Sequence, residues 1–489
     1  MKIKFLPFLA GGLLMTSTFF SSCLDSDMKE IVYSSETSIY SFSLGTIRIE
    51  RQGKDTLGKD TIFIDTMNCA KYPFTIDQFK RTIENKDSLP VTADVSKVLC
   101  NLKADTELIT YKKKDSKGEL KDTMWTKKDS LDYRNPVSMT VYAANGIPGK
   151  PYTIKVNIHK QYPEALLWKH FGSSKFASSS LIKQKTVLLD QTLYTFGENK
   201  DKNIVVERMK LNEGSVSTWE MVATLPAKTN PYSAQVWGDK IYFTASGKLY
   251  QLDLNEKNAS VQVGTLNNLK NLVGVGNIAA NKEVLLAFTQ ENKVVGLNKD
   301  GNLASDQAFG FIKEQAFATN RLSSVSYPAR HNTSLVRNII MTNNPATSAN
   351  DTTSCVYNYV TNDTQWSKFI MPNPTVCPNL ENISMIRYDK KLYAFGGGLE
   401  SKKIKPFEHF YCSNDNGLTW QKVTKNVVFP QEEGTTKDNN VRPFVNYYTA
   451  NVEGSYSTIV DANHFIWFIW KDGTMTRGRI NRLGFAPKW

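Results

Sequence analysis

Few residues of this 489-residue chain have the type and spacing that catalysis or metal binding needs. Glu432 and Glu433 form one acidic pair, and paired carboxylates can serve as acid and base in glycoside hydrolysis. Adjacent glutamates in a loop are, however, more often solvated than catalytic. The five histidines lie far apart and form no H-x-x-x-H or H-E-x-x-H pattern, so we expect no metal and no cofactor: His159, His170, His331, His409 and His464.

The segment 411–420, YCSNDNGLTW, has a spacing with a clear mechanical role. An Asp can accept backbone N–H groups in a hairpin, a Gly can adopt a conformation that a Cβ would oppose, and a Trp can pack under the turn. The segment resembles the Asp-box of sialidase-like propellers, which indicates a propeller hairpin and says little about activity. The resemblance assigns a structural role, away from the ligand-binding face, to Ser413, Asp415, Gly417, Thr419 and Trp420.

The first 22 residues have the composition of an export signal. Lys2 and Lys4 precede an apolar stretch that is too short for a membrane span, and Ser21 and Ser22 precede Cys23. This resembles a bacterial lipobox, in which the cysteine receives the lipid; an ordinary secretory signal is the alternative. The acidic residues that follow resemble the surface-export signal of Bacteroidetes lipoproteins. We therefore expect a protein anchored to outer-membrane lipid through Cys23, at the cell surface, with the periplasmic face left open.

Asp followed by Ser or Thr and then an apolar residue recurs within residues 55–131. The pattern resembles the O-glycosylation acceptor of Bacteroidetes, although the same pairs are common in turns. The candidate acceptors are Thr56, Thr61, Thr66, Ser88, Thr123 and Ser130.

An exported chain can form disulfides, and five cysteines follow Cys23. None lies in a C-x-x-C spacing. Cys69 with Cys100 and Cys355 with Cys377 are the local pairings, which leaves Cys412 as a buried free thiol.

Alternating apolar residues predict a small β-domain over residues 37–160, after a tether at 23–36. The runs at 38–50, 61–64, 72–76, 137–143 and 152–158 have the period of two that one buried face requires. Residues 77–84 are expected to form a short helix. This pattern favours an immunoglobulin-like sandwich.

Residues 161–184 are expected to form a linker and the start of a second domain, and residues 185–489 repeat one unit. Each unit is an apolar run after a turn, and successive units lie roughly 40–55 residues apart, as in propeller blades, with a longer last interval. An inserted loop within 425–445 would account for that interval. The runs are 193–197, 241–244, 285–288, 339–341, 392–398 and 466–469.

A second feature shares this period. Trp219, Trp366 and Trp420 each come directly after a Thr or Gln. Each tryptophan also lies at a similar distance along the chain after one of the apolar runs. Large aromatic side chains at a fixed position in each blade would fill the wedge between neighbouring sheets. We therefore predict an all-β protein with a sandwich followed by a six-bladed β-propeller; a second β-sandwich is the alternative.

The run 392–398, LYAFGGG, resembles a kelch strand. As a whole the chain resembles a family of Bacteroidetes lipoproteins with an immunoglobulin-like N-terminal domain and a kelch-like, Asp-box propeller. The resemblance implies a fold and a location but no settled activity.

The net charge of +13 is spread over the chain. The basic runs at 112–114, 127–128 and 402–403 are short and lack interleaved aromatics, so we expect no nucleic-acid partner. A cationic surface can favour acidic polysaccharides.

Three functions fit these observations. The first is a non-enzymatic module that binds a glycan or protein through the propeller face, where Trp237, Tyr447 or Tyr448 would stack on sugars unless they pack between blades. The second is a glycoside hydrolase or lyase of sialidase-like propeller type. The third is a structural subunit that docks on a membrane-protein partner.

Overall fold

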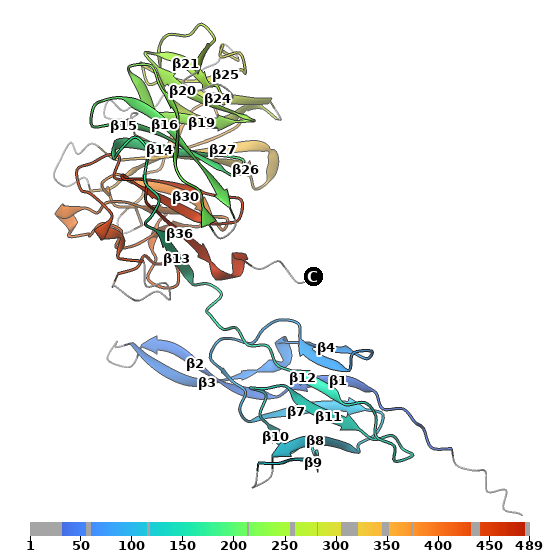
Figure 1. Ribbon diagram of the computed structural model, residues 1–489. Helices are drawn as coiled ribbons and strands as arrows, with labels where there is room; N and C mark the ends of the chain where they lie inside the picture. Colours follow the sequence, from blue (N-terminus) through green and yellow to red (C-terminus); the bar gives the residue numbers. More distant parts are fainter. Residues whose placement is uncertain are drawn as a thin grey trace, which may run out of the picture. The chain divides into compact units, whose positions relative to one another are not determined.

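The computed structural model describes residues 32–54, 60–114, 118–212, 215–254, 260–280, 282–304, 321–344, 352–372, 375–431 and 441–484. The chain divides into two compact units, with the boundary between Tyr162 and Pro163. Figure 1 shows the strands of both units. Within the described residues, no helix is long and apolar enough to cross a bilayer.

The N-terminal unit contains two main sheets. One has the order β1-β7-β10 and the other β4-β5-β12-β11-β8-β9, in which β5 and β12 are parallel. Neighbouring strands are antiparallel throughout β1-β7-β10 and throughout β12-β11-β8. The strands are β1 (Ile39–Leu44), β4 (Phe74–Asp77), β5 (Thr82–Asn85), β7 (Val98–Ala104), β8 (Ile109–Lys114), β9 (Leu120–Met124), β10 (Ser130–Leu131), β11 (Val137–Val141) and β12 (Tyr152–Lys155).

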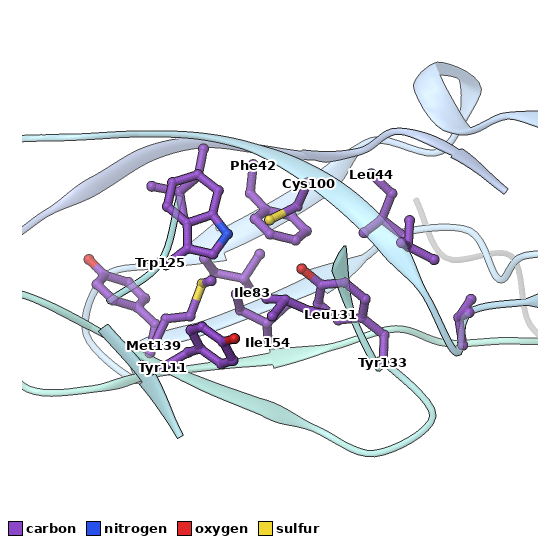
Figure 2. Packing of buried hydrophobic residues seen from close by; sticks show 14 of the residues in the cluster. Phe42, Leu44, Ile83, Cys100, Tyr111, Trp125, Leu131, Tyr133, Met139 and Ile154 are labelled. Carbon is purple, nitrogen blue, oxygen red and sulfur yellow. The ribbon is translucent and has the colours of Figure 1, made fainter. Parts of the chain in front are cut away.

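The core of this unit lies where the buried rows of the two sheets meet (Figure 2). Buried and exposed residues alternate along β7, as the period of a strand requires, and Val98, Cys100 and Leu102 point inward. Phe42 packs edge-on against Tyr133, with ring centroids 6.2 Å apart. A third sheet, β3-β2-β6, adds a long hairpin of β2 (Thr46–Lys54) and β3 (Asp60–Asn68), with β6 (Ala93–Asp94) at its side.

The helix expected over residues 77–84 is wrong. Strand β4 ends at Asp77, and its carboxylate accepts hydrogen bonds from the backbone N–H groups of Phe79 at 3.0 Å and Lys80 at 2.9 Å. This Asx-type turn offers the backbone an alternative to helix. Strand β5 follows and pairs with both β4 and β12, so it gains hydrogen bonds on two sides.

The C-terminal unit is a β-propeller of six sheets (Figure 1). Within each sheet, neighbouring strands are antiparallel. In the first five sheets the inner strand is the one that comes first in the chain, and in the last sheet the inner strand is β34. The inner strands are in contact around a ring, in the order β14, β19, β23, β26, β30, β34 and back to β14. They are β14 (Leu181–Leu189), β19 (Thr229–Trp237), β23 (Leu269–Ala279), β26 (Ser323–Ala329), β30 (Ser384–Tyr388) and β34 (Tyr456–Val460).

The remaining strands extend the sheets outward. They are β15 (Thr192–Asn199), β16 (Ile204–Asn212), β17 (Ser215–Val216) and β18 (Glu220–Thr224); β20 (Lys240–Ala245), β21 (Lys248–Leu252) and β22 (Ser260–Val263); β24 (Lys282–Thr289) and β25 (Val294–Leu297); β27 (Asn332–Thr342), β28 (Cys355–Val360) and β29 (Ser367–Lys368); β31 (Lys391–Phe395), β32 (Tyr411–Ser413) and β33 (Gln421–Lys422); β35 (Ile466–Trp470) and β36 (Met475–Ile480).

One strand closes the ring. β13 (Leu166–Phe171), from the start of this unit, pairs with β36 from its end in a register that runs from Leu166 with Ile480 to Phe171 with Met475. The last sheet therefore has the order β13-β36-β35-β34.

Each of the six repeated apolar runs begins on the strand that lies next to the inner strand of its sheet. These strands are β15, β20, β24, β27, β31 and β35. These strands are flanked within the sheet and covered on both faces, so they read as nearly continuous apolar sequence. Ile466–Trp470 is buried at every position.

The three tryptophans fill the wedges between neighbouring sheets, as their spacing predicts. Trp219 donates a hydrogen bond of 2.8 Å to the Gly473 carbonyl in the β35–β36 turn of the preceding blade. Trp366 belongs to the cluster that contains Phe288 of β24, and Trp420 to the cluster that contains Ile339 of β27.

Neither of the two local cysteine pairings is a disulfide in this structure. Cys69, Cys100, Cys355 and Cys377 are buried free thiols, and Cys412 is a half-buried one. Desolvation raises the pKa of the Cys69 and Cys100 thiols, which keeps them protonated. They act as small apolar side chains.

Candidate functional site: the central cavity of the propeller

The five Asp-box residues lie in the turn between β32 and β33 and bind one another. The Ser413 hydroxyl donates to Asp415 at 2.7 Å and accepts the Gly417 N–H at 2.8 Å. Asp415 also accepts the Thr419 N–H at 2.9 Å. Trp420 is buried, and its Nε1 donates to the Gly417 carbonyl at 3.0 Å. Gly417 has a φ of 91°, which a Cβ would strain.

Burial opposes ionisation of Asp415, but hydrogen bonds from Thr419 and Ser413 outweigh it and hold the pKa of that carboxyl below its usual value. With its acceptors occupied inside the turn, this carboxylate is structural.

This turn lies at the end of the propeller where the inner strands finish. In the β30 sheet, Arg387 pairs with Leu392, and Leu392 pairs with Ser413. Ser413 is therefore level with the carboxyl end of β30, opposite the end at which Ser384 begins the strand.

A cavity of about 410 Å³ lies along the inner strands. Its lining comes from β14, β19, β26, β30 and β34 and from the residues just before β26 and β30. Tyr232, Arg321, Ser384 and Tyr456 stand at or near the amino ends of their strands, so they mark the end of the cavity that the blade-to-blade connections reach.

Lys185 and Arg321 bring positive charge to this end. Lys185, on β14, is half-buried and donates to the Tyr232 backbone carbonyl at 2.9 Å. Burial lowers the pKa of Lys185 to about 7. Arg321 donates to the carbonyl oxygens of Glu453 and Asn382.

Two tyrosine rings hold the Arg321 guanidinium. Its Cζ lies 5.7 Å from the ring centroid of Tyr232 and 5.6 Å from that of Tyr456. Both distances are within the range of cation–π attraction. Because both tyrosines are buried, they orient the guanidinium rather than offer a face to a ligand.

Tyr232 also binds a carboxylate. Its hydroxyl donates to Glu453 Oε2 at 3.1 Å. Burial raises the pKa of Tyr232 well above its usual range, so the phenol keeps its proton. Glu453 is exposed and is not part of the cavity lining.

The connection between β33 and β34, described over 423–431 and 441–455, positions this rim. Its aromatic side chains enter a large aromatic cluster: Phe429 stacks on Phe410 at 3.9 Å between centroids, and Phe444 meets Trp168 at 4.8 Å. The Gly454 N–H then donates to the Ile182 carbonyl at 2.8 Å, which fixes Glu453 beside β14.

Tyr448 comes from the same connection, and its hydroxyl accepts a hydrogen bond of 3.0 Å from Asn382. Of the glycines in LYAFGGG, Gly397 leaves room for this tyrosine, because a Cβ there would collide with the Tyr448 hydroxyl. Tyr447 stacks on His170 at 4.5 Å, and Trp237 is buried beside Tyr242. All three aromatics therefore pack within the propeller.

Other predicted residues are not gathered at the cavity. Cys23, Thr56, Glu432 and Glu433 lie outside the described residues. The other candidate glycosylation acceptors belong to the N-terminal unit, where Thr66 and Ser130 are exposed and three are half-buried: Thr61, Ser88 and Thr123. Among described residues, no group of three His, Cys, Asp or Glu side chains could hold a metal ion.

Sequence comparison assigns the family. The DUF6242 beta propeller domain matches residues 162–488, which is more than half of the chain. The chain belongs to the DUF6242 family. The N-terminal domain of the same family, a domain of unknown function, matches residues 42–156. No curated protein matches the sequence of this DUF6242 member.

Several solved structures are similar to the DUF6242 chain at low identity and low TM-score. A carbohydrate-active enzyme of family AA12 from Trichoderma reesei has a TM-score of 0.39 and 9% identity, covering 66% of this chain and 99% of that chain. An α-L-arabinofuranosidase from Fusarium graminearum has a TM-score of 0.35 and 11% identity, covering 64% of this chain and 97% of that chain. The N-terminal domain of Nup159 has a TM-score of 0.31 and 10% identity, covering 65% of this chain and 96% of that chain.

Proposed function

We propose that this DUF6242 protein is a lipid-anchored, surface-exposed binding protein without enzymatic activity, whose kelch-like propeller engages a glycan or a membrane-protein partner. The sequence supports the anchor through Cys23. The central cavity supports binding, since small-molecule pockets are concave and roughly 300–1,000 Å³ in volume. The observation that carries the proposal is this 410 Å³ cavity, with hydrogen-bond donors at one end.

A glycoside hydrolase is the second candidate, because the Tyr232 hydroxyl and the Glu453 carboxylate are hydrogen-bonded beside Arg321. A tyrosine nucleophile would have to pass its proton to such a carboxylate. The raised pKa of Tyr232 opposes this step, so we rank binding above catalysis.

A glycan array with the full mature protein tests the proposal. Saturable retention of one glycan class supports it, and so does a silent array with a membrane protein recovered by crosslinking at the cell surface. Release of a reducing end, or hydrolysis of an aryl sialoside, would replace it with the hydrolase. The Glu453→Gln protein is the control in that assay, because it should lose hydrolysis.

A further inference from the structure

The charged side chains that line the central cavity are all cationic. Lys185, Arg321 and Arg387 line it, and the lining contains no aspartate or glutamate among the described residues. Arg387 is at the far end, 4.2 Å above the Tyr327 ring, while Lys185 and Arg321 both contact Tyr232. Two cations therefore share one end of the cavity.

Neither of these two cations has an ionised partner in the described part of the chain. Lys185 and Arg321 donate to backbone carbonyls, which accept hydrogen bonds but do not neutralise charge. The nearby Glu453 carboxylate accepts from Tyr232 instead. Holding an uncompensated cation in a half-buried position costs free energy, and proteins accept that cost mostly where a ligand supplies the opposite charge.

The hydroxyl groups around them are largely occupied. Ser323 donates to the Met385 carbonyl at 3.0 Å, and the Tyr456 hydroxyl donates to Ser384 at 3.0 Å. Thr186 and Ser457 bind each other. Much of the wall is thus preorganised, and the donors that remain include the N–H groups of Lys185 and Arg321 and the buried Thr458 hydroxyl.

Building on the proposed function, we infer that this cavity binds a sugar carboxylate, with the anionic group held between Lys185 and Arg321. The planar guanidinium fork matches a carboxylate, and the lysine adds a point charge. The cavity volume accommodates one or two sugar rings and excludes a polymer duplex or a folded domain. An acidic saccharide would therefore insert its terminal sugar into the cavity.

The lowered pKa of Lys185 supplies an independent readout. A bound carboxylate stabilises the ammonium form, so binding above pH 7 takes up a proton, and the affinity falls as pH rises. The two tyrosines beside this end of the cavity do not titrate in this range, because burial raises the pKa of Tyr232 and of Tyr456, the latter to about 12.

The test is calorimetric titration of the mature chain with three acidic sugars and their neutral partners: galacturonate with galactose, glucuronate with glucose, and N-acetylneuraminate with N-acetylmannosamine. We expect one acid to bind at least about tenfold more tightly than its partner, as a charge-assisted hydrogen bond predicts. Titration at pH 8 in Tris and in HEPES should give different heats, which report the proton uptake.

Two variants locate the site. Arg321→Gln and Lys185→Met should each weaken binding of that acid at least about tenfold, and the second should also abolish the proton uptake. Arg482→Gln is the matched control, because Arg482 is paired with Glu164 and Asp389 outside the cavity. Its binding should equal that of the unmodified chain. Circular dichroism melting separates lost binding from lost folding, and the two cavity variants provide independent tests.

Other outcomes overturn the inference. Equal affinity for acids and neutral sugars, or full affinity in both cavity variants, removes the anion site while leaving a glycan-binding propeller. Tight, Arg321-dependent binding of inorganic phosphate or sulfate, with no preference among sugars, shows an anion site for a different ligand class. No binding of any sugar or ion, with a protein partner recovered, removes the inference and leaves the docking form of the proposed function.

Discussion

At one end of the propeller, the side chains of Ser413, Asp415 and Thr419 bind one another, whereas at the other end Lys185 and Arg321 bind backbone carbonyls. Both ends are rich in polar groups, and both contact inner strands. At the first end, the donors of a single turn satisfy the Asp415 carboxylate, and at the second end two cations border a cavity with no printed ion pair among the described residues. The difference indicates that charge facing an open cavity, rather than polarity alone, marks where a ligand would bind.

The largest effect should come from the Asp-box end. Trp420→Ala removes a buried indole between two blades and should lower the free energy of unfolding by about 3–5 kcal/mol. Denaturant unfolding measures this loss. Ligand affinity below the transition should be unchanged, and a variant that loses affinity while folded would contradict the division between the two ends.

Asp415→Asn should lower the free energy of unfolding by about 1–3 kcal/mol, because the turn loses a charged hydrogen-bond acceptor. The pKa of Asp415 is lowered in the folded state, so its contribution is present above the unfolded value near 4 and is lost as pH falls through the folded value. Unfolding curves at pH 7 and pH 3 check this. The free energies of unfolding of the variant and the unmodified protein should differ less at pH 3 than at pH 7. An equal difference at both pH values would show that the charge of the carboxylate does not contribute to stability.

Lys185→Met should change stability in the opposite direction. The folded state holds Lys185 with a pKa of about 7 against about 10.4 when unfolded, so the unmodified protein gains stability between these values as pH rises. The variant removes the desolvation cost and should be more stable by about 1–3 kcal/mol near pH 6, with the gain fading toward pH 10. Thermal melts across this range test it; a destabilised variant would mean that Lys185 has an internal counter-ion.

The smallest effect should come from Arg482→Gln. Its partners Glu164 and Asp389 tie the start of the propeller unit to the β30–β31 turn, but the site is partly exposed, and such pairs contribute about 0–1 kcal/mol. The melting temperature should shift by no more than a few degrees. A larger loss would show that this pair, rather than strand pairing, holds β13 in place.

The repeated strands were predictable from sequence because each is decided locally. Runs such as 193–197 and 466–469 are apolar on both faces, and the Asp-box needs only neighbours within a few residues. The short helix at 77–84 was mispredicted because nothing local shows that β5 has partners on both sides. The pairing of the cysteines could not be decided from sequence, because spacing along the chain does not report how far apart buried thiols lie.

The cavity residues were beyond sequence reasoning for the same reason. Lys185 reads as the outward position of an alternating strand, and Arg321 as an ordinary loop arginine. They become neighbours only when β14 and β26 enter the same ring, around Tyr232.

The pairing of β13 with β36 has a consequence for how this protein matures. The segment that must complete the circle leaves the ribosome early, while its three sheet partners are the last to be made. Until residue 480 has emerged, the edges of β13 and β35 that pair with β36 remain open to wrong partners, as unpaired strand edges generally are. Folding of this unit therefore cannot finish before its last strand is made, so a truncation that removes β36 should favour aggregation over a stable five-sheet product.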